Sequence, residues 1–148
     1  MSEEQTPQTP TVPQALGRLR VALNDSFNRA SRDVGLTAQQ AELLCQVLEP
    51  RSISELAERL HWDRSNVSHL VNRVSARDLV DRLPDDQDGR VSRVVVTDSG
   101  RTAAVTFLRR LEALTGDLRR DWSPERTATA AELLTEIAES LEVAADEA

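Results

Sequence analysis

A charged loop from Asp85 to Arg93 holds the residue types in this sequence that could carry chemistry. It reads Asp-Asp-Gln-Asp-Gly-Arg-Val-Ser-Arg, and a β-branched run follows it at 94–97. Acids, a glycine and arginines within one short segment leave three interpretations open. The loop is an acidic metal site, a solvated turn, or a turn that holds an arginine out toward a partner.

The register of the loop decides against the metal site. When Gly89 is aligned with the glycine of a calcium-binding loop, Pro84 falls at the first ligand position and Val95 at the last. Neither side chain can offer an oxygen to a cation. The calcium interpretation therefore fails.

The arginine interpretation gives each polar residue of the loop a role. Arg90 is expected to be the working residue that is held out toward the partner, Asp88 is expected to brace its guanidinium by a bidentate pair, and Gly89 is expected to permit the turn. Arg93 is expected to contact a phosphate. The remaining acids are expected mainly to form the turn: Asp85 and Asp86.

Upstream of this loop, the sequence predicts a helix with one apolar and one polar face. Asp63 is placed to cap its N-terminus, and no acid lies between Arg64 and Arg77. Arginine can bond guanine twice, asparagine can pair with the adenine edge, and serine or histidine can bond a base or a phosphate. The polar face is therefore predicted to contact DNA through seven residues: Arg64, Ser65, Asn66, Ser68, His69, Asn72 and Arg73.

A solvated helix face is the simpler interpretation of these seven residues when they are considered alone. The segment that follows favours DNA, because the apolar period changes from 3.6 toward 2 after Leu79. Val80, Arg82 and the run 91–97 predict two short strands joined by the charged loop. A helix-turn-helix followed directly by a β-hairpin is a winged helix. Within the helix, we expect Asn66 and His69 to read bases.

Apolar spacing and capping signals predict the elements before this helix. One amphipathic helix is expected at about 14–34, and a second runs from Thr37 until Pro50 stops it. The run Ser52-Ile53-Ser54-Glu55 is a capping box that opens a short third helix. His61 and Trp62 then form a tight connection, in which Trp62 is expected to fill the core.

Two more helices are predicted after the hairpin. A long one begins at Asp98 or Ser99 and carries an apolar stripe that reaches Trp122. Ser123 and Pro124 are the N-cap and first residue of the last helix. The predicted fold class is mainly α with a small β wing.

The net charge of the 148-residue chain is −7, which by itself disfavours a nucleic-acid partner because DNA repels an acidic surface. The charge is uneven, however, since residues 51–93 are neutral and the acidic excess lies at both ends. The predicted DNA-binding segment thus has none of the chain's excess of negative charge.

Other functional classes find little support in the sequence. Two His and a single Cys cannot form a Cys/His zinc site or an intramolecular disulfide. Cys45 lies on an apolar stripe with no basic neighbour in sequence, so a buried structural thiol is favoured over a redox sensor. No nucleophile triad or phosphate loop appears. We expect neither an enzyme, nor a bound metal, nor a cofactor.

The polar, proline-rich residues 1–13 predict a disordered tail without a secretory signal. No later segment approaches the roughly 18 consecutive apolar residues of a membrane span. A soluble, cytoplasmic protein without a membrane partner is expected.

The segment from Leu56 to Gly100 resembles the MarR family of bacterial transcriptional regulators, whose wing carries an Asp-x-Arg motif and a strand ending near Leu-Thr-x-x-Gly. Here the motif is Asp88-Gly89-Arg90, and the strand ends in Val96-Thr97-Asp98-Ser99-Gly100. The flanking helices follow the family's order. Two positions depart from the family pattern: Asp78 stands where glycine is usual, and Asp86 where proline is common.

This resemblance implies one domain at 14–148, in which 36–98 form the DNA-binding lobe and 14–35 and 99–148 form dimerisation helices. It also implies a homodimer on double-stranded DNA, each subunit placing a recognition helix in a major groove and a wing toward a minor groove. The operator would be pseudo-palindromic, with half-sites about one helical turn apart.

Repression that a small-molecule effector relieves is the family's common mode of action, and no pocket residue can be assigned from the sequence. The alternative is a dimeric ligand-binding or protein-interaction module that does not bind DNA. Such a module would not need a clean basic face.

Overall fold

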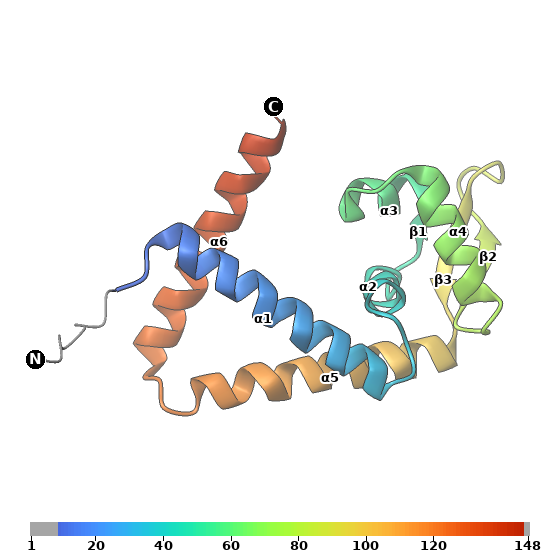
Figure 1. Cartoon of the computed structure of the whole chain (residues 1–148). Helices are drawn as coiled ribbons and strands as arrows, with labels where there is room; N and C mark the ends of the chain where they lie inside the picture. The colour runs from blue at the N-terminus through green and yellow to red at the C-terminus, as the bar shows by residue number, and fades with distance from the viewer. Residues whose placement is uncertain (1–8, 147–148) are drawn as a thin grey trace, which may run out of the picture. The chain divides into compact units, whose positions relative to one another are not determined.

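The computed structural model describes residues 9–146, apart from the side chains at 115, 118, 119 and 144–146 (Figure 1). It is mainly α-helical with one small sheet, as predicted. The chain divides into two compact units, Met1–Leu111 and Glu112–Ala148. The elements in chain order are α1 Val12–Asp33, α2 Ala38–Gln46, β1 Arg51–Ser52, α3 Ile53–Leu60, α4 Arg64–Ser75, β2 Val80–Pro84, β3 Ser92–Val96, α5 Asp98–Arg119 and α6 Pro124–Asp146.

Capping boxes start three of the helices. The Gln40 side chain accepts the amide of Thr37 at α2, and Glu55 accepts that of Ser52 at α3. The same device, between Thr11 and Gln14, starts α1 at Val12. The predicted tail over 1–13 is therefore too long by two residues at its end, while 1–8 lie outside the described part of the chain.

The wing belongs to a three-stranded antiparallel sheet with the order β1-β3-β2. The hairpin of β2 and β3 was predicted, and it pairs Val80 with Val96 and Pro84 with Ser92. The two-residue strand β1 was not predicted. It pairs Arg51 with Val94 and Ser52 with Arg93, so that the start of α3 is joined to strand β3 of the wing.

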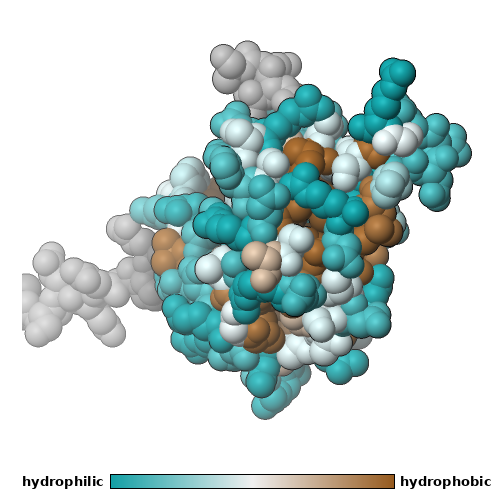
Figure 2. Space-filling model, turned by 90° about the vertical axis from the view of Figure 1, so that its right-hand side faces the viewer, coloured by the Kyte–Doolittle hydropathy of each residue, from teal (hydrophilic) through white to brown (hydrophobic). Residues whose placement is uncertain are grey.

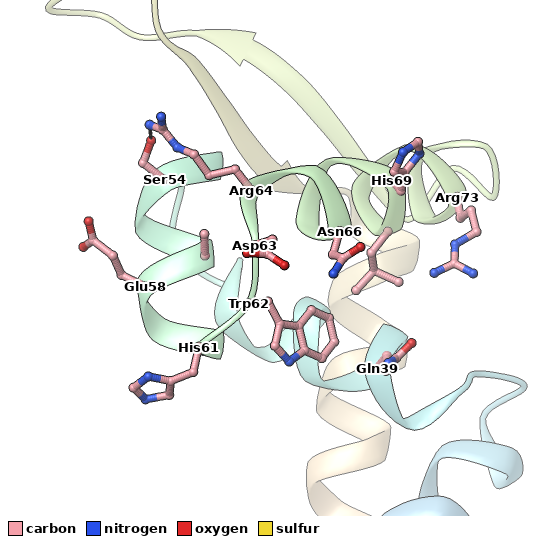
Figure 3. A pocket seen from close by; sticks show the side chains of 12 residues that line it. Gln39, Ser54, Glu58, His61, Trp62, Asp63, Arg64, Asn66, His69 and Arg73 are labelled. Atoms are coloured by element: carbon pink, nitrogen blue, oxygen red, sulfur yellow. Dashed lines mark hydrogen bonds between the residues drawn. The ribbon is translucent and has the colours of Figure 1, made fainter. Parts of the chain in front are cut away.

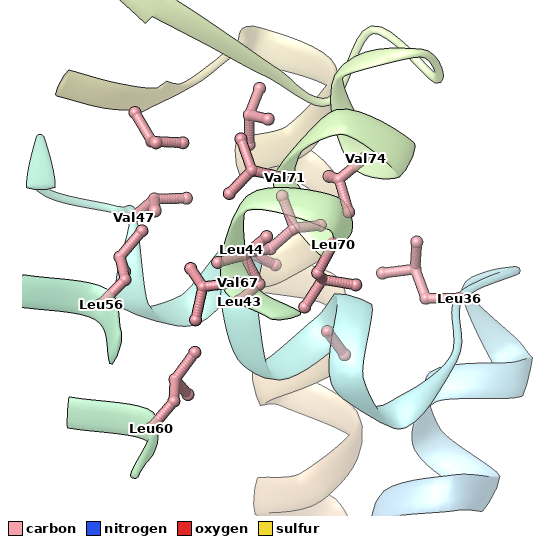
Figure 4. Close-up of a cluster of buried hydrophobic side chains, with 14 of the residues drawn as sticks. Leu36, Leu43, Leu44, Val47, Leu56, Leu60, Val67, Leu70, Val71 and Val74 are labelled. Carbon is pink, nitrogen blue, oxygen red and sulfur yellow. The ribbon is translucent and has the colours of Figure 1, made fainter. Parts of the chain in front are cut away.

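One apolar cluster holds the helix-turn-helix together, as Figure 4 shows. Leu43 and Leu44 of α2 and Leu56 of α3 are fully buried in it, beside the apolar face of α4. Within the same unit, Phe27 of α1 and Phe107 of α5 meet edge to face at 5.5 Å between ring centres. A packed apolar core thus supports the polar face of α4.

Three turns among the described residues need left-handed backbone geometry, one of them at His61 between α3 and α4. Gly35 has φ +70° where α1 ends, and Asp78 has φ 55° at the turn into β2. Asp78 is the position where the MarR pattern usually has glycine, and aspartate tolerates left-handed geometry better than most residues. Gly100 in α5 has no room for a side chain, because an added Cβ would lie 1.9 Å from the Leu79 carbonyl oxygen.

The unit from Glu112 onward contains the end of α5 and all of α6. Ser123 Oγ accepts the amide of Arg126, which confirms the predicted cap. Because α5 ends at Arg119, Trp122 lies after the helix and not on its stripe, and the Arg126 guanidinium stands 4.9 Å from its ring centre. None of the helices in the described part of the chain is long and apolar enough to cross a membrane.

Candidate nucleic-acid interface

Helix α4 presents a polar face because its other face is completely buried. The predicted apolar residues Val67, Leu70, Val71 and Val74 are at most 1% exposed. The polar residues predicted to bind DNA lie on the opposite side. Ser68 is half-buried, and the other six are exposed: Arg64, Ser65, Asn66, His69, Asn72 and Arg73. The polar face is therefore accessible to a partner.

The turn between α3 and α4 fixes the direction of this face. His61 ends α3 in left-handed geometry with φ 53°, and the amide of Trp62 donates to the Ala57 carbonyl at 3.0 Å. The half-buried Trp62 side chain packs against the core, as predicted. Asp63 occupies the N-cap position of α4, but its side chain makes no capping bond. The predicted cap is therefore correct in position only.

A groove of about 870 Å³ runs along α4 (Figure 3). Asn66, His69 and Arg73 line it from α4, Trp62 from the turn, and Gln39 from α2. Among the residues that the structure describes, no hydrogen bond engages the side chains of Asn66, His69 or Arg73. Their donors and acceptors remain available to a ligand that enters the groove.

Arg64 is exposed at the other end of the face. Its guanidinium donates to the hydroxyl of Ser54 in α3. A single neutral partner leaves the charge uncompensated, so Arg64 can still attract an anion.

Arg82 is a functional candidate that sequence reasoning missed. From β2 it donates to Oδ1 of Asn72 at 2.7 Å and reaches Oγ of Ser68 at 3.5 Å. Both acceptors lie on the polar face of α4. Arg82 thereby joins the wing to the recognition surface and orients the Asn72 amide. Strand alternation marked Arg82 as a wing residue, but only the packing of β2 on α4 reveals its partners.

Asp85 organises the start of the wing loop. Its Oδ1 accepts the amides of Gln87 at 2.8 Å and Asp88 at 3.0 Å. Its own amide donates to the Val91 carbonyl at 2.8 Å, which closes the base of the loop. The turn-forming role expected for Asp85 is confirmed.

The brace expected between Asp88 and Arg90 has another form. The Asp88 carboxylate accepts the backbone amide of Arg90 at 3.0 Å, and within the described chain it pairs with no guanidinium. The brace prediction is therefore wrong, because a carboxylate two residues upstream meets the nearby amide more easily than the end of a long side chain. The exposed Arg90 guanidinium is left without a described partner. Gly89 does not have positive φ, so the turn does not require a glycine there.

Arg93 makes two ion pairs inside the protein that the sequence did not predict. Its guanidinium pairs with Asp85 through Nε and with Glu55 through Nη1, the latter at 2.8 Å. These contacts use Nε and Nη1, while Nη2 has no hydrogen-bond partner among the described residues. The phosphate contact expected for Arg93 therefore stays a prediction.

These pairs change the acidity of their members. The Arg93 hydrogen bond, together with the amides of Gln87 and Asp88, lowers the pKa of Asp85 to about 2. The Ser52 amide is the main cause of a lowered pKa at Glu55. The pKa of Arg93 is raised, chiefly by Asp85. All three groups are therefore charged at neutral pH.

Cys45 lies half-buried against the core. Burial, and then the charge of Glu42, raises the pKa of its thiol to about 11. A thiol that stays protonated at neutral pH is a poor nucleophile. This agrees with the structural role predicted for it.

Known proteins that are similar to this chain in sequence are regulators of transcription. Residues 34–91 match the model of the MarR family. The chain is 25% identical over 129 residues to YybA of Bacillus subtilis, an uncharacterized HTH-type transcriptional regulator, with 86% of each chain covered. It is 31% identical over 107 residues to the transcriptional activatory protein BadR of Rhodopseudomonas palustris. This match covers 68% of this chain and 61% of BadR.

A solved structure supports the fold. BpsR of Bordetella bronchiseptica, whose regulation of DNA binding by 6-hydroxynicotinic acid has been described, superimposes with a TM-score of 0.69 at 23% identity. The match covers 90% of this chain and 98% of BpsR. The relatives are regulators, in agreement with the prediction that the chain is not an enzyme. The chain belongs to the MarR family and is a DNA-binding, winged-helix transcriptional regulator.

Proposed function

We propose that the chain binds a pseudo-palindromic operator as a homodimer and represses transcription until a small-molecule effector lowers its affinity for DNA. The observation that carries this proposal is the exposed polar face of α4 beside a wing whose Arg90 guanidinium pairs with no residue that the structure describes. In Figure 1 α4, β2 and β3 lie on the right, the side that Figure 2 turns toward the viewer. The face seen in Figure 2 is mostly hydrophilic, with smaller hydrophobic areas, as suits a polar partner.

The DNA contacts follow from which side chains remain unengaged. Asn66 and His69 are proposed to read bases in the major groove, with Arg73 on guanine or phosphate. From the wing, the unpaired Arg90 guanidinium is proposed to enter the minor groove, and Asp88 supports it by holding its backbone amide. The remaining proposed contacts from α4 are Arg64, Ser65, Ser68 and Asn72, the last two oriented by Arg82.

A homodimer would cover apolar surface that α1 and α6 expose. In α1, Leu19, Val21 and Leu23 are 37 to 52% exposed. In α6 the exposed fraction reaches 49 to 60% at four residues: Leu133, Leu134, Leu141 and Val143. Helices that show this much apolar surface favour a partner, and a second copy supplies one with two-fold symmetry. We therefore propose 14–35 and 99–148 as dimerisation helices and 36–98 as the DNA-binding lobe.

The effector and the direction of regulation are proposed by analogy. BpsR gives a precedent for control of DNA binding by a small aromatic acid. BadR is named an activatory protein, so relatives of this chain are not confined to repression. An effector would act by favouring a conformation with a different spacing of the recognition helices, and its effect would equal its difference in affinity for the two states. The cytoplasm, where the operator lies, is the proposed location.

A gel-shift experiment tests the proposal. Purified protein is mixed at low salt with DNA fragments that span the surroundings of its own gene, and with an unrelated fragment of equal length. We expect selective retardation of one fragment, and light scattering should give twice the mass of one chain. Absence of any retarded fragment at low salt would favour a module that does not bind DNA. A reporter behind the retarded fragment then distinguishes repression from activation.

A further inference from the structure

Glu55 joins the start of α3 to the wing. Its Oε2 atom accepts the Ser52 amide at 2.6 Å, as part of the capping box, and the Arg93 Nη1 donor at 2.8 Å. Ser52 and Arg93 are also paired residues of β1 and β3. One carboxylate oxygen thus serves both the helix-turn-helix and the wing.

Asp85 joins the other end of the Arg93 guanidinium to the wing loop. The side chain of Asp85 is only 10% exposed, and its two oxygens have separate tasks. Oδ1 holds the amides of Gln87 and Asp88, while Oδ2 receives Nε of Arg93. Arg93 therefore spans from the loop that presents Arg90 to the helix that leads into α4.

The charge of this cluster argues against a direct DNA contact. One guanidinium faces two carboxylates, so the cluster has an excess of negative charge, which DNA repels. A phosphate could approach Arg93 only at the donors that the two carboxylates leave, beside their negative charge. A lone exposed ion pair has little effect on stability, but Arg93 is two-thirds buried and shared by two acids that other bonds already hold in place.

We propose that Arg93 is a positioning residue, which fixes the wing against the N-terminus of α3 through Asp85 and Glu55 and so places Arg90 relative to α4. This inference rests on the proposed DNA-binding function. It predicts a change in DNA affinity opposite to the one expected from charge alone. Removing an acid near DNA should tighten binding if charge alone matters, whereas losing either acid here should weaken binding because the wing is released.

Two conservative variants separate these effects. Asp85→Asn keeps an oxygen for the amides of the loop, and Glu55→Gln keeps one for the Ser52 amide. Each removes one charge from Arg93. The matched control is Asp86→Asn, which removes the same charge from an exposed neighbour in the same loop.

Operator affinity is measured by fluorescence anisotropy for these variants, Arg93→Gln and the double variant D85N/R93Q. We expect Asp85→Asn and Glu55→Gln to bind roughly three- to thirtyfold more weakly, a loss within the range found for residues that share one polar network. Asp86→Asn should bind equally well or more tightly. The double variant should lose no more affinity than Arg93→Gln alone, because both substitutions remove the same ion pair between Asp85 and Arg93.

A phosphate contact by Arg93 predicts the opposite pattern. Asp85→Asn would then bind as tightly as Asp86→Asn or more tightly, and Arg93→Gln would reduce the slope of log affinity against log salt by about 1. That pattern would overturn the inference. Melting temperatures within a few degrees of the wild type exclude general unfolding as the cause of weaker binding.

A second measurement needs no DNA. The ¹⁵N order parameters of the Gly89 and Arg90 amides should fall in Arg93→Gln and stay unchanged in Asp86→Asn. Equal order parameters in Arg93→Gln and wild type would overturn the inference. If the wild type binds no DNA at all, the proposed function fails, and this measurement still decides whether Arg93 positions the wing.

Discussion

Substitution of Gly100 by alanine should destabilise the protein strongly, although the change adds only one methyl group. The new Cβ would lie 1.9 Å from the Leu79 carbonyl oxygen and 2.8 Å from Cγ2 of Val96. The first contact is to backbone, so the start of α5 must move away from the turn before β2. That movement would stretch the bond from the Thr97 amide to the same carbonyl, now 3.1 Å.

The magnitude follows from two costs. Overpacking of a tight site costs about 1 to 3 kcal/mol, and loss of one hydrogen bond costs about 1 kcal/mol more. The free energy of unfolding should therefore fall by about 2 to 4 kcal/mol. At about 2 to 4 °C per kcal/mol, the melting temperature should fall by roughly 5 to 15 °C.

Two other glycines are matched controls. Gly17 in α1 and Gly116 in α5 both lie within helices, and a Cβ at either would meet nothing within 4 Å. Alanine there should raise stability by about 0.5 to 1 kcal/mol, because glycine loses more backbone entropy in a helix. Circular dichroism melts at one protein concentration compare the variants. An unchanged melting temperature for Gly100→Ala would refute the described packing of α5 against Leu79.

Three further predictions concern single side chains. Arg93 lowers the pKa of Asp85 to about 2, so the pair's contribution to stability is present above about pH 4 and is lost as pH falls toward 2; a ¹³C carboxyl titration should give this pKa, and in Arg93→Gln a value closer to 3.8. The pKa of Cys45 is raised to about 11, so iodoacetamide should react slowly at pH 8 in the native protein and fast in urea, and stability should decline between about pH 8.5 and 11 as the unfolded thiol ionises. Fast native alkylation would contradict the burial of this thiol. Arg82→Ala should cost about 1 to 2 kcal/mol of DNA-binding free energy, and calorimetry should show that its loss and that of Asn72→Ala are less than additive; strict additivity would disprove their coupling.

The helices were predictable because their signals are local. The capping box of Ser52 and Glu55, the apolar stripe of α4 and the left-handed turn at Asp78 depend on residues a few positions apart. The start of α1 was missed even though Thr11 and Gln14 have the same box spacing, because the prolines around them suggested a disordered tail. That signal was present in the sequence.

The side-chain partners of the wing were not predictable in the same way. Arg93 meets Glu55 across 38 positions of sequence, and Arg82 meets Asn72 only because β2 packs against α4. Spacing placed both arginines in the wing without showing which acid or amide they face. Pairing across β1 and β3 was equally hidden, since a two-residue strand has no period. The polar face of α4 needed no partner to be recognised.

The most direct test of DNA binding through the α4 face and the wing is the operator affinity of Arg90→Ala across a salt series, beside Arg59→Ala. Both variants remove one exposed arginine, but Arg59 lies in α3, outside the proposed DNA contacts and the proposed dimerisation helices. Arg90→Ala should weaken binding by about 1 to 3 kcal/mol and reduce the salt slope by about 1, with the dimer intact. Arg59→Ala should match the wild type. Equal affinity and slope for Arg90→Ala and wild type, with both folded, would contradict the account.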